Sequence, residues 1–132
     1  MFNRKKILEG IEKTRKEKAQ NYGSEKESLF STVRKALERM QVLGVYGVTY
    51  VPDYPSPEYD VLTRYLAVEN GPDDDLNKEF KEYVIKPFHA QLKVDDIGVY
   101  IQKEQGSFRP TITVTIQKDL PTTDEEKETP VL

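Results

Sequence analysis

Side chains able to do catalytic chemistry are few and scattered in this sequence. Histidine occurs once, as His89, and cysteine does not occur in the 132 residues. Zinc is held mostly by clusters of cysteine and histidine, so zinc sites of the common kinds and cysteine nucleophiles are excluded. A lone histidine near the end of a predicted helix is usually structural, so we expect no catalytic role for it.

Runs of acidic residues are the remaining candidates for metal chemistry. Asp95 and Asp96 precede a predicted strand, and Asp73, Asp74 and Asp75 precede a predicted helix. Carboxylates can hold Mg²⁺ or Ca²⁺, but neither run has the alternating spacing of a calcium loop. At a helix start, carboxylates are stabilised by the helix dipole. Glycine-rich phosphate loops are also missing. We therefore predict no catalytic residue, no metal and no cofactor, and keep a cryptic metal-dependent enzyme as an alternative.

Basic side chains are concentrated at the start of the chain. Residues 1–44 carry 11 basic and 6 acidic side chains, whereas residues 45–132 carry 9 and 17. Basic side chains bind phosphates, so nucleic-acid binding is a second alternative. Its candidate residues are Lys5, Lys6, Lys13, Arg15, Lys16 and Lys18. Against it, Glu12 and Lys16 have the spacing of an ion pair on a solvated helix, and the whole chain has a net charge of -3.

Tyrosine and proline gather between residues 45 and 65. Five of the eight tyrosines lie there, interleaved with three prolines. Tyrosine is enriched where a surface buries area against a partner, and proline lowers the entropy lost on docking. We therefore predict a partner-binding surface at Tyr50, Tyr54 and Tyr59. Tyr54 and Tyr59 are the expected exposed pair, because Tyr50 could instead pack on the protein's own sheet.

Two helices are predicted to begin the chain. The composition of residues 4–22 indicates a surface helix, with Ile7, Leu8 and Ile11 on one face. Residues 24–43 have a clear helical period, and the predicted buried face consists of Leu29, Val33, Ala36, Leu37, Met40 and Leu43.

A turn is predicted between these two helices. Gly23 favours a left-handed helix end, while Ser24 and Glu27 have the spacing of a capping box for the second helix. The two helices are therefore expected to fold back on one another as a helical hairpin.

The middle of the chain is predicted to hold one strand and two helical segments. Residues 45–51 are rich in β-branched and aromatic types and indicate a strand. Residues 58–69 fit either a helix, begun by Ser56, or a strand that pairs back on 45–51. A further helix starts near residue 76, and Pro87 should kink or end it.

A β-hairpin is predicted at the end of the ordered chain. Apolar residues alternate in 97–103 and in 108–118, with a turn that contains Gly106. Threonines 111, 113 and 115 are expected on the solvated face of the second arm, and Pro110 should mark an edge or the start of pairing.

The predicted fold class is α+β, with the helical hairpin and a further helix packed on a small antiparallel sheet. We expect one domain over residues 1–120, with a basic helical part at 1–44 and a mixed part at 45–120. Residues 121–132 are acidic and predicted to form a flexible tail.

The predicted function is non-enzymatic: a protein-interaction or assembly protein that binds a protein partner or itself, without a membrane. No secretory signal or apolar run of spanning length is visible, which predicts a soluble protein. Small, charged chains without cysteine or enzyme motifs are common in phages and mobile elements. We therefore expect a virion component or a host-directed inhibitor, located in the host cytoplasm or in the virion.

Overall fold

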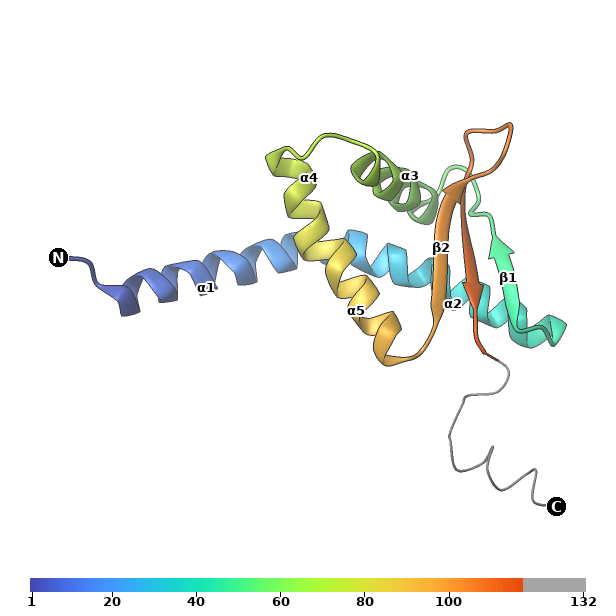
Figure 1. The fold of residues 1–132 in the computed structure, drawn as a ribbon, viewed down its shortest axis with the longest axis horizontal. Coiled ribbons are helices and arrows are strands. Elements are labelled where there is room, and N and C mark those ends of the chain that lie inside the picture. Colours follow the sequence, from blue (N-terminus) through green and yellow to red (C-terminus); the bar gives the residue numbers. More distant parts are fainter. Residues whose placement is uncertain (118–132) are drawn as a thin grey trace, which may run out of the picture.

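The computed structural model describes residues 1–117 (Figure 1). The predicted tail at 121–132 and the predicted domain end at residue 120 lie outside this range. The elements are, in order, α1 (Arg4–Asn21), α2 (Gly23–Leu43), β1 (Gly47–Tyr50), α3 (Pro57–Glu69), α4 (Asp75–Phe80), the π-helical turn η1 (Lys81–Ile85), α5 (Lys86–Val94), β2 (Gly98–Lys103) and β3 (Pro110–Thr115). The predicted α+β class and the N-terminal helical pair are confirmed.

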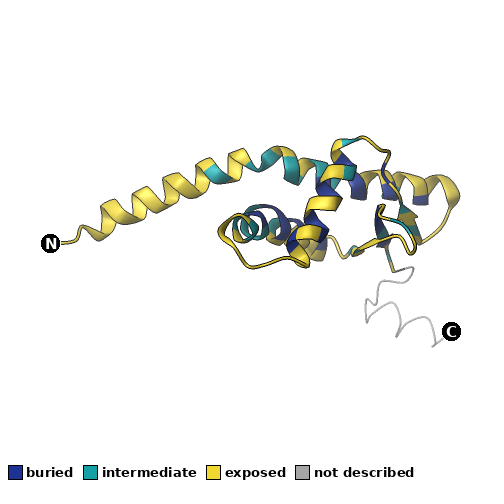
Figure 2. Ribbon diagram, turned by 90° about the horizontal axis from the view of Figure 1, so that it is seen from above, coloured by how far each residue is buried: buried dark blue, intermediate teal, exposed yellow. Residues whose placement is uncertain are grey.

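The two N-terminal helices follow one another end to end, not as the predicted hairpin (Figures 1 and 2). Only Tyr22 separates them, and its carbonyl accepts the amide hydrogen of Lys26. Gly23 is the first residue of α2 and does not have the positive φ that the prediction required. Ser24 therefore lies inside the helix, and no side chain caps the start of α2. Contacts of Tyr22 with α4 and η1, described below, hold this junction.

The sheet within residues 1–117 has three antiparallel strands in the order β1–β3–β2. β2 and β3 form the predicted hairpin, and the turn residue Gly106 has a φ of 76°. β1 pairs with β3, so that Tyr50 lies opposite Ile112. Pro110 is the first residue of the central strand, where its missing amide hydrogen costs least, as expected.

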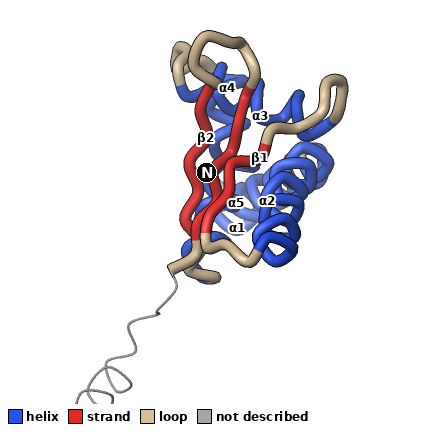
Figure 3. The backbone as a smooth tube through the Cα atoms, turned by 90° about the vertical axis from the view of Figure 1, so that its right-hand side faces the viewer, coloured by secondary structure: helices blue, strands red, loops and turns tan. Residues whose placement is uncertain are grey.

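Helices α2 and α3 cover one face of this sheet, and the core lies between these helices and the sheet (Figure 3). Ile112 and Val114 project into the core from the central strand and are fully buried. The other face carries Thr113, which is half-buried, and Thr115, which is exposed. Thr111 was expected to be solvated but is buried. Its hydroxyl donates to the carbonyl of Gln102 at 3.1 Å, and this hydrogen bond replaces the one that water would provide.

Residues 58–69 belong to a helix, which decides between the two predicted structures. The Ser56 hydroxyl accepts the amide hydrogen of Tyr59 at 3.0 Å, and Pro57 occupies the first helical position. This N-cap satisfies an amide that would otherwise lack a partner. Val61, Leu62 and their neighbours on the same face then pack in the core.

The helix that contains Pro87 neither ends nor breaks at the proline. The amide hydrogen of Lys86 bonds to the carbonyl of Lys81, five residues earlier, which is a π-helical turn. Proline clashes with the carbonyl four residues before it in a regular α-helix, and a wider turn relieves this crowding. α5 therefore continues through Pro87 and buries Phe88 and Leu92.

The buried face of α2 is close to the predicted one. Leu29, Val33, Ala36 and Met40 are buried, as expected. Leu37 is only half-buried, and Leu43, the last residue of the helix, is exposed. Among residues 1–117, no helix combines the length and the apolar character needed to cross a membrane.

Candidate functional site

Helix α1 projects from the body of the protein (Figures 1 and 2). The side chain of Asn3 begins it by accepting the amide hydrogen of Lys6 at 3.2 Å. No residue of α1 is buried, and Lys18 is its one residue of intermediate burial; the rest of the helix is exposed. The predicted surface helix is confirmed, and it is more fully exposed than a helix lying along the body would be.

The C-terminal half of α1 is anchored to α4 and η1. Arg15 pairs with Glu82 at 3.0 Å, and Lys18 pairs with Glu79 at 2.8 Å. Hydrogen bonds from Lys18 and Tyr22 hold the pKa of Glu79 below its usual value. These exposed pairs stabilise little on their own, but they fix the direction in which α1 leaves the body.

Aromatic contacts complete this anchor. The ring of Tyr22 stacks on Tyr83 with centroids 6.0 Å apart and meets the edge of Phe80 at 6.4 Å. The guanidinium of Arg15 lies 5.5 Å from the centre of the Tyr83 ring. The hydrogen bonds, ion pairs and ring contacts between α1 and the body begin at Arg15, so the first turns of α1 extend past the body.

The open part of α1 carries an apolar stripe, which we call the N-terminal stripe and define as Ile7, Leu8 and Ile11. Their exposed fractions are 50%, 45% and 49%. Residues spaced by three, four or seven share a helix face, so the stripe lies on the same face as Arg15 and Lys18. The face of α1 that docks on the body near Arg15 and Lys18 therefore extends toward the N-terminus as an apolar surface. No part of residues 1–117 covers it there.

The six predicted basic residues do not form one surface. Arg15 and Lys18 are used in the ion pairs to Glu82 and Glu79. Lys6, Lys13 and Lys16 are exposed and form no salt bridge within residues 1–117. Lys13 and Lys16 line, with Arg15, a shallow groove against Glu82 and Tyr83 of η1. Lys5 lies instead along the edge of the stripe, in a shallow groove formed with Arg4, Leu8, Glu9 and Glu12.

The predicted tyrosine surface is brought together only in part. Tyr54 is 76% exposed, and its ring lies edge-on to that of Tyr59 at 4.8 Å. Tyr50 projects inward from β1 and packs against the core. Burial raises its pKa, while Lys35 beside the hydroxyl acts in the opposite direction. Tyr54 and the outer part of Tyr59 are therefore the portion of this surface that a partner could reach.

An ion pair beneath this surface predicts a pH dependence of stability. Lys35 donates to Glu58 at 2.5 Å, and Glu58 is buried except for 11% of its side chain. This hydrogen bond lowers the pKa of Glu58 below its ordinary 4.5. Stability from a lowered carboxyl pKa is complete above the unfolded value and is lost as the pH falls through the folded value.

We therefore expect Glu58→Gln to reduce the free energy of unfolding by about 1 kcal/mol near neutral pH. The difference from the wild type should shrink below pH 4.5, which urea unfolding at several pH values measures. Glu27→Gln is a suitable control, because that pair with Arg34 is largely exposed. A difference that grew on acidification would contradict the assigned role of Lys35.

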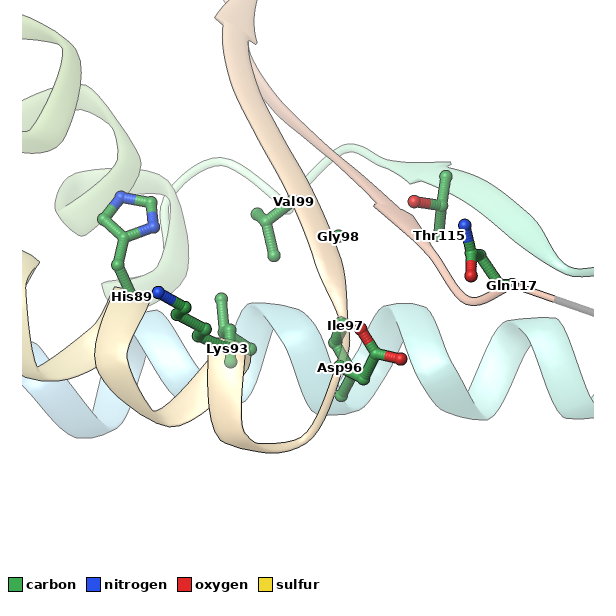
Figure 4. Close-up of a pocket in the computed structure, with 9 residues that line it drawn as sticks. His89, Lys93, Asp96, Ile97, Gly98, Val99, Thr115 and Gln117 are labelled. Atoms are coloured by element: carbon green, nitrogen blue, oxygen red, sulfur yellow. The ribbon is translucent and has the colours of Figure 1, made fainter. Parts of the chain in front are cut away.

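A groove of about 420 Å³ lies between the end of α5 and the adjoining strands (Figure 4). His89 and Lys93 line it from α5, and Thr115 and Gln117 line it from the opposite side. The Nε2 atom of His89 is 2.7 Å from the hydroxyl of Tyr65, whose pKa burial raises to about 12. This contact ties α5 to α3, so the lone histidine has a structural partner.

The acidic runs have local structural roles. Asp74 is the N-cap of α4 and accepts the amide hydrogen of Asn77 at 2.9 Å, while Asp95 accepts a hydrogen bond from Gln91 at 3.1 Å. In the part of the chain that is described, no three His, Asp or Glu side chains gather closely enough to hold a metal ion.

No protein-family model, curated protein or solved structure matches this chain.

The N-terminal stripe is an exposed apolar surface that the sequence analysis does not single out as a candidate site. Its three residues were used only to identify a helix face. The available signal was the change along that face, from Ile7 and Ile11 to the polar residues Thr14 and Lys18. A helix face that is apolar at one end and charged at the other need not be covered by a single neighbour.

Proposed function

We propose that this chain is a non-enzymatic protein-interaction or assembly module that binds its partner through the N-terminal stripe of α1. The observation that carries the proposal is the stripe itself. Ile7, Leu8 and Ile11 are each about half-exposed on a helix that extends past the body, on the same face that docks there. Apolar side chains arranged in this way are typical of a helix that lays one face against a partner.

Helix energetics support a partner for this segment. The first turns of α1 have no tertiary contacts within residues 1–117 to stabilise them, and Gly10 costs about 1 kcal/mol relative to alanine. Covering three half-exposed aliphatic side chains would return roughly 1 kcal/mol each. Binding of a partner would therefore cover the stripe and also stabilise the helix that carries it.

The proposal extends to the setting of the protein. A chain with no cysteine and 33% charged residues suits a phage or mobile-element protein that acts in the host cytoplasm or in the virion. A projecting helix fits either a virion component or a host-directed inhibitor.

Three surface variants test which region binds the partner. In the first, Ile7, Leu8 and Ile11 are replaced by serine; in the second, Tyr54 and Tyr59 are replaced by alanine. The first should weaken self-association or binding to a purified partner at least a hundredfold, because apolar anchors dominate interface energies. The second should weaken it less, since Tyr59 is already half-buried and its ring packs against that of Tyr54. Calorimetry or sedimentation measures both.

The third variant replaces Lys6, Lys13 and Lys16 by serine and tests the alternative of nucleic-acid binding. One observation favours that alternative: these three side chains are exposed and form no salt bridge within residues 1–117. Phosphate binding would weaken steeply with salt, whereas apolar docking would not. Loss of binding in this variant at low salt, with the serine stripe variant unaffected, would replace the proposed function by nucleic-acid binding.

A further inference from the structure

We propose that the N-terminal stripe binds the same stripe of a second copy of this chain, with the two α1 helices antiparallel about a two-fold axis near residue 9. This inference rests on the proposed function and names its partner. The features that carry it are the position of the stripe and the charges along its edge.

The body of the protein favours an antiparallel pair. It lies on the face of α1 that bears the stripe, as the pairs of Arg15 with Glu82 and Lys18 with Glu79 show. In a parallel pair, two bodies would compete for the same space beside the paired helices. Figure 1 shows the first turns of α1 extending away from the body. In an antiparallel pair the two bodies therefore lie at opposite ends, and the open turns of the two helices overlap.

The apolar residues of the stripe match themselves in this arrangement. An antiparallel pair centred near residue 9 places Ile7 of one copy opposite Ile11 of the other. Leu8 then lies beside its own equivalent, next to the axis, so the three apolar side chains of each copy face those of the other.

The charges along the edge of the stripe are also self-complementary. Lys5 and Glu12 border Leu8 along one groove on α1, seven residues apart. In the antiparallel pair, Lys5 of each copy lies beside Glu12 of the other, which gives two equivalent ion pairs. A parallel pair would instead bring Arg4, Lys5 and Lys6 of both copies together, and like charges at that distance repel.

The interface is small, so the dimer should be weak. About 11 residues of each helix overlap, which corresponds to roughly 16 Å of helix. Contacts of this size fall in the class of transient complexes, and we expect a dissociation constant in the micromolar range. The chain should therefore exchange between monomer and dimer as its concentration changes.

A charge exchange tests this pairing on the full chain by sedimentation equilibrium. Lys5→Glu and Glu12→Lys should each raise the dissociation constant about tenfold, because each places like charges together twice. The double variant should return to within about threefold of the wild type. Lys5 and Glu12 are two turns apart, so a direct contact within one helix cannot explain such a rescue. Lys6→Glu, which lies outside the grooves that contain Lys5 and Glu12, is the matched control.

The outcomes separate this inference from the proposed function. A chain that stays monomeric up to millimolar concentration overturns the inference. The proposed function still holds in that case if the serine stripe variant loses a purified partner that the wild type binds. A dimer without rescue in the double variant overturns the antiparallel pairing. A dimer that survives serine replacement of the whole stripe overturns both. Circular dichroism of every variant excludes loss of fold as the cause.

Discussion

Phe88→Ala is expected to lower the free energy of unfolding by about 3–5 kcal/mol. Phe88 is fully buried on α5, and its ring centre is 5.3 Å from that of Phe30 on α2. Removing the ring leaves a cavity between two helices that also hold the sheet, and close-packed surroundings fill such a cavity only in part. Urea unfolding followed by circular dichroism measures the loss.

Phe108→Ala is the matched control for this prediction. Phe108 is 87% exposed in the loop between β2 and β3, so its loss should change stability by less than about 0.5 kcal/mol. Equal effects of the two substitutions would place Phe88 outside the core and would contradict the packing of α5 against α2.

Amide exchange should differ by orders of magnitude between the first turns of α1 and the core of α2 in a dilute, unassociated sample. Amides near Ile7 and Ile11 are in a helix segment without tertiary contacts, which opens locally at little cost. Amides near Leu29 and Ala36, which are fully buried, should exchange only when most of the molecule unfolds. Exchange followed by NMR at low concentration measures the ratio.

Gly10→Ala sharpens this comparison. The added methyl group meets no neighbour, so its effect is the helix propensity of alanine, worth about 1 kcal/mol. Exchange in the first turns of α1 should slow by about fivefold, while exchange in α2 stays the same. Slow exchange in the wild type at all concentrations would contradict the absence of stabilising contacts around this segment.

The elements that the sequence predicts well are those with a strong local period. The 3.6-residue period of α2 and the alternation of Ile112, Val114 and Ile116 depend on neighbouring residues alone. Local signals also misled at one place, because Gly23 and Ser24 have the chemistry of a helix junction but lie within α2. Tertiary contacts of Tyr22 with Tyr83 hold the two helices end to end and override that local preference.

Strand order and the outcome for residues 58–69 depend on packing that no local pattern encodes. β1 pairs with β3, more than sixty residues later, and residues 57–69 form α3, which packs against α2 and β3 and does not pair with β1. The ion pairs of α1 likewise depend on residues far away in the sequence. Lysine and arginine types on α1 were visible in the sequence, but the partners of Arg15 and Lys18 are Glu82 and Glu79, 67 and 61 residues away.

Binding through the N-terminal stripe is tested most directly by amide exchange at Ile7, Leu8 and Ile11 in the associated state. The sample is the full chain, either concentrated or saturated with a purified partner, compared with the dilute chain. If the stripe is the contact, exchange at these three positions slows at least tenfold on association, while exchange at the exposed residue Tyr100 of β2 is unchanged. Association that leaves the three stripe amides as fast as in the dilute chain would contradict it.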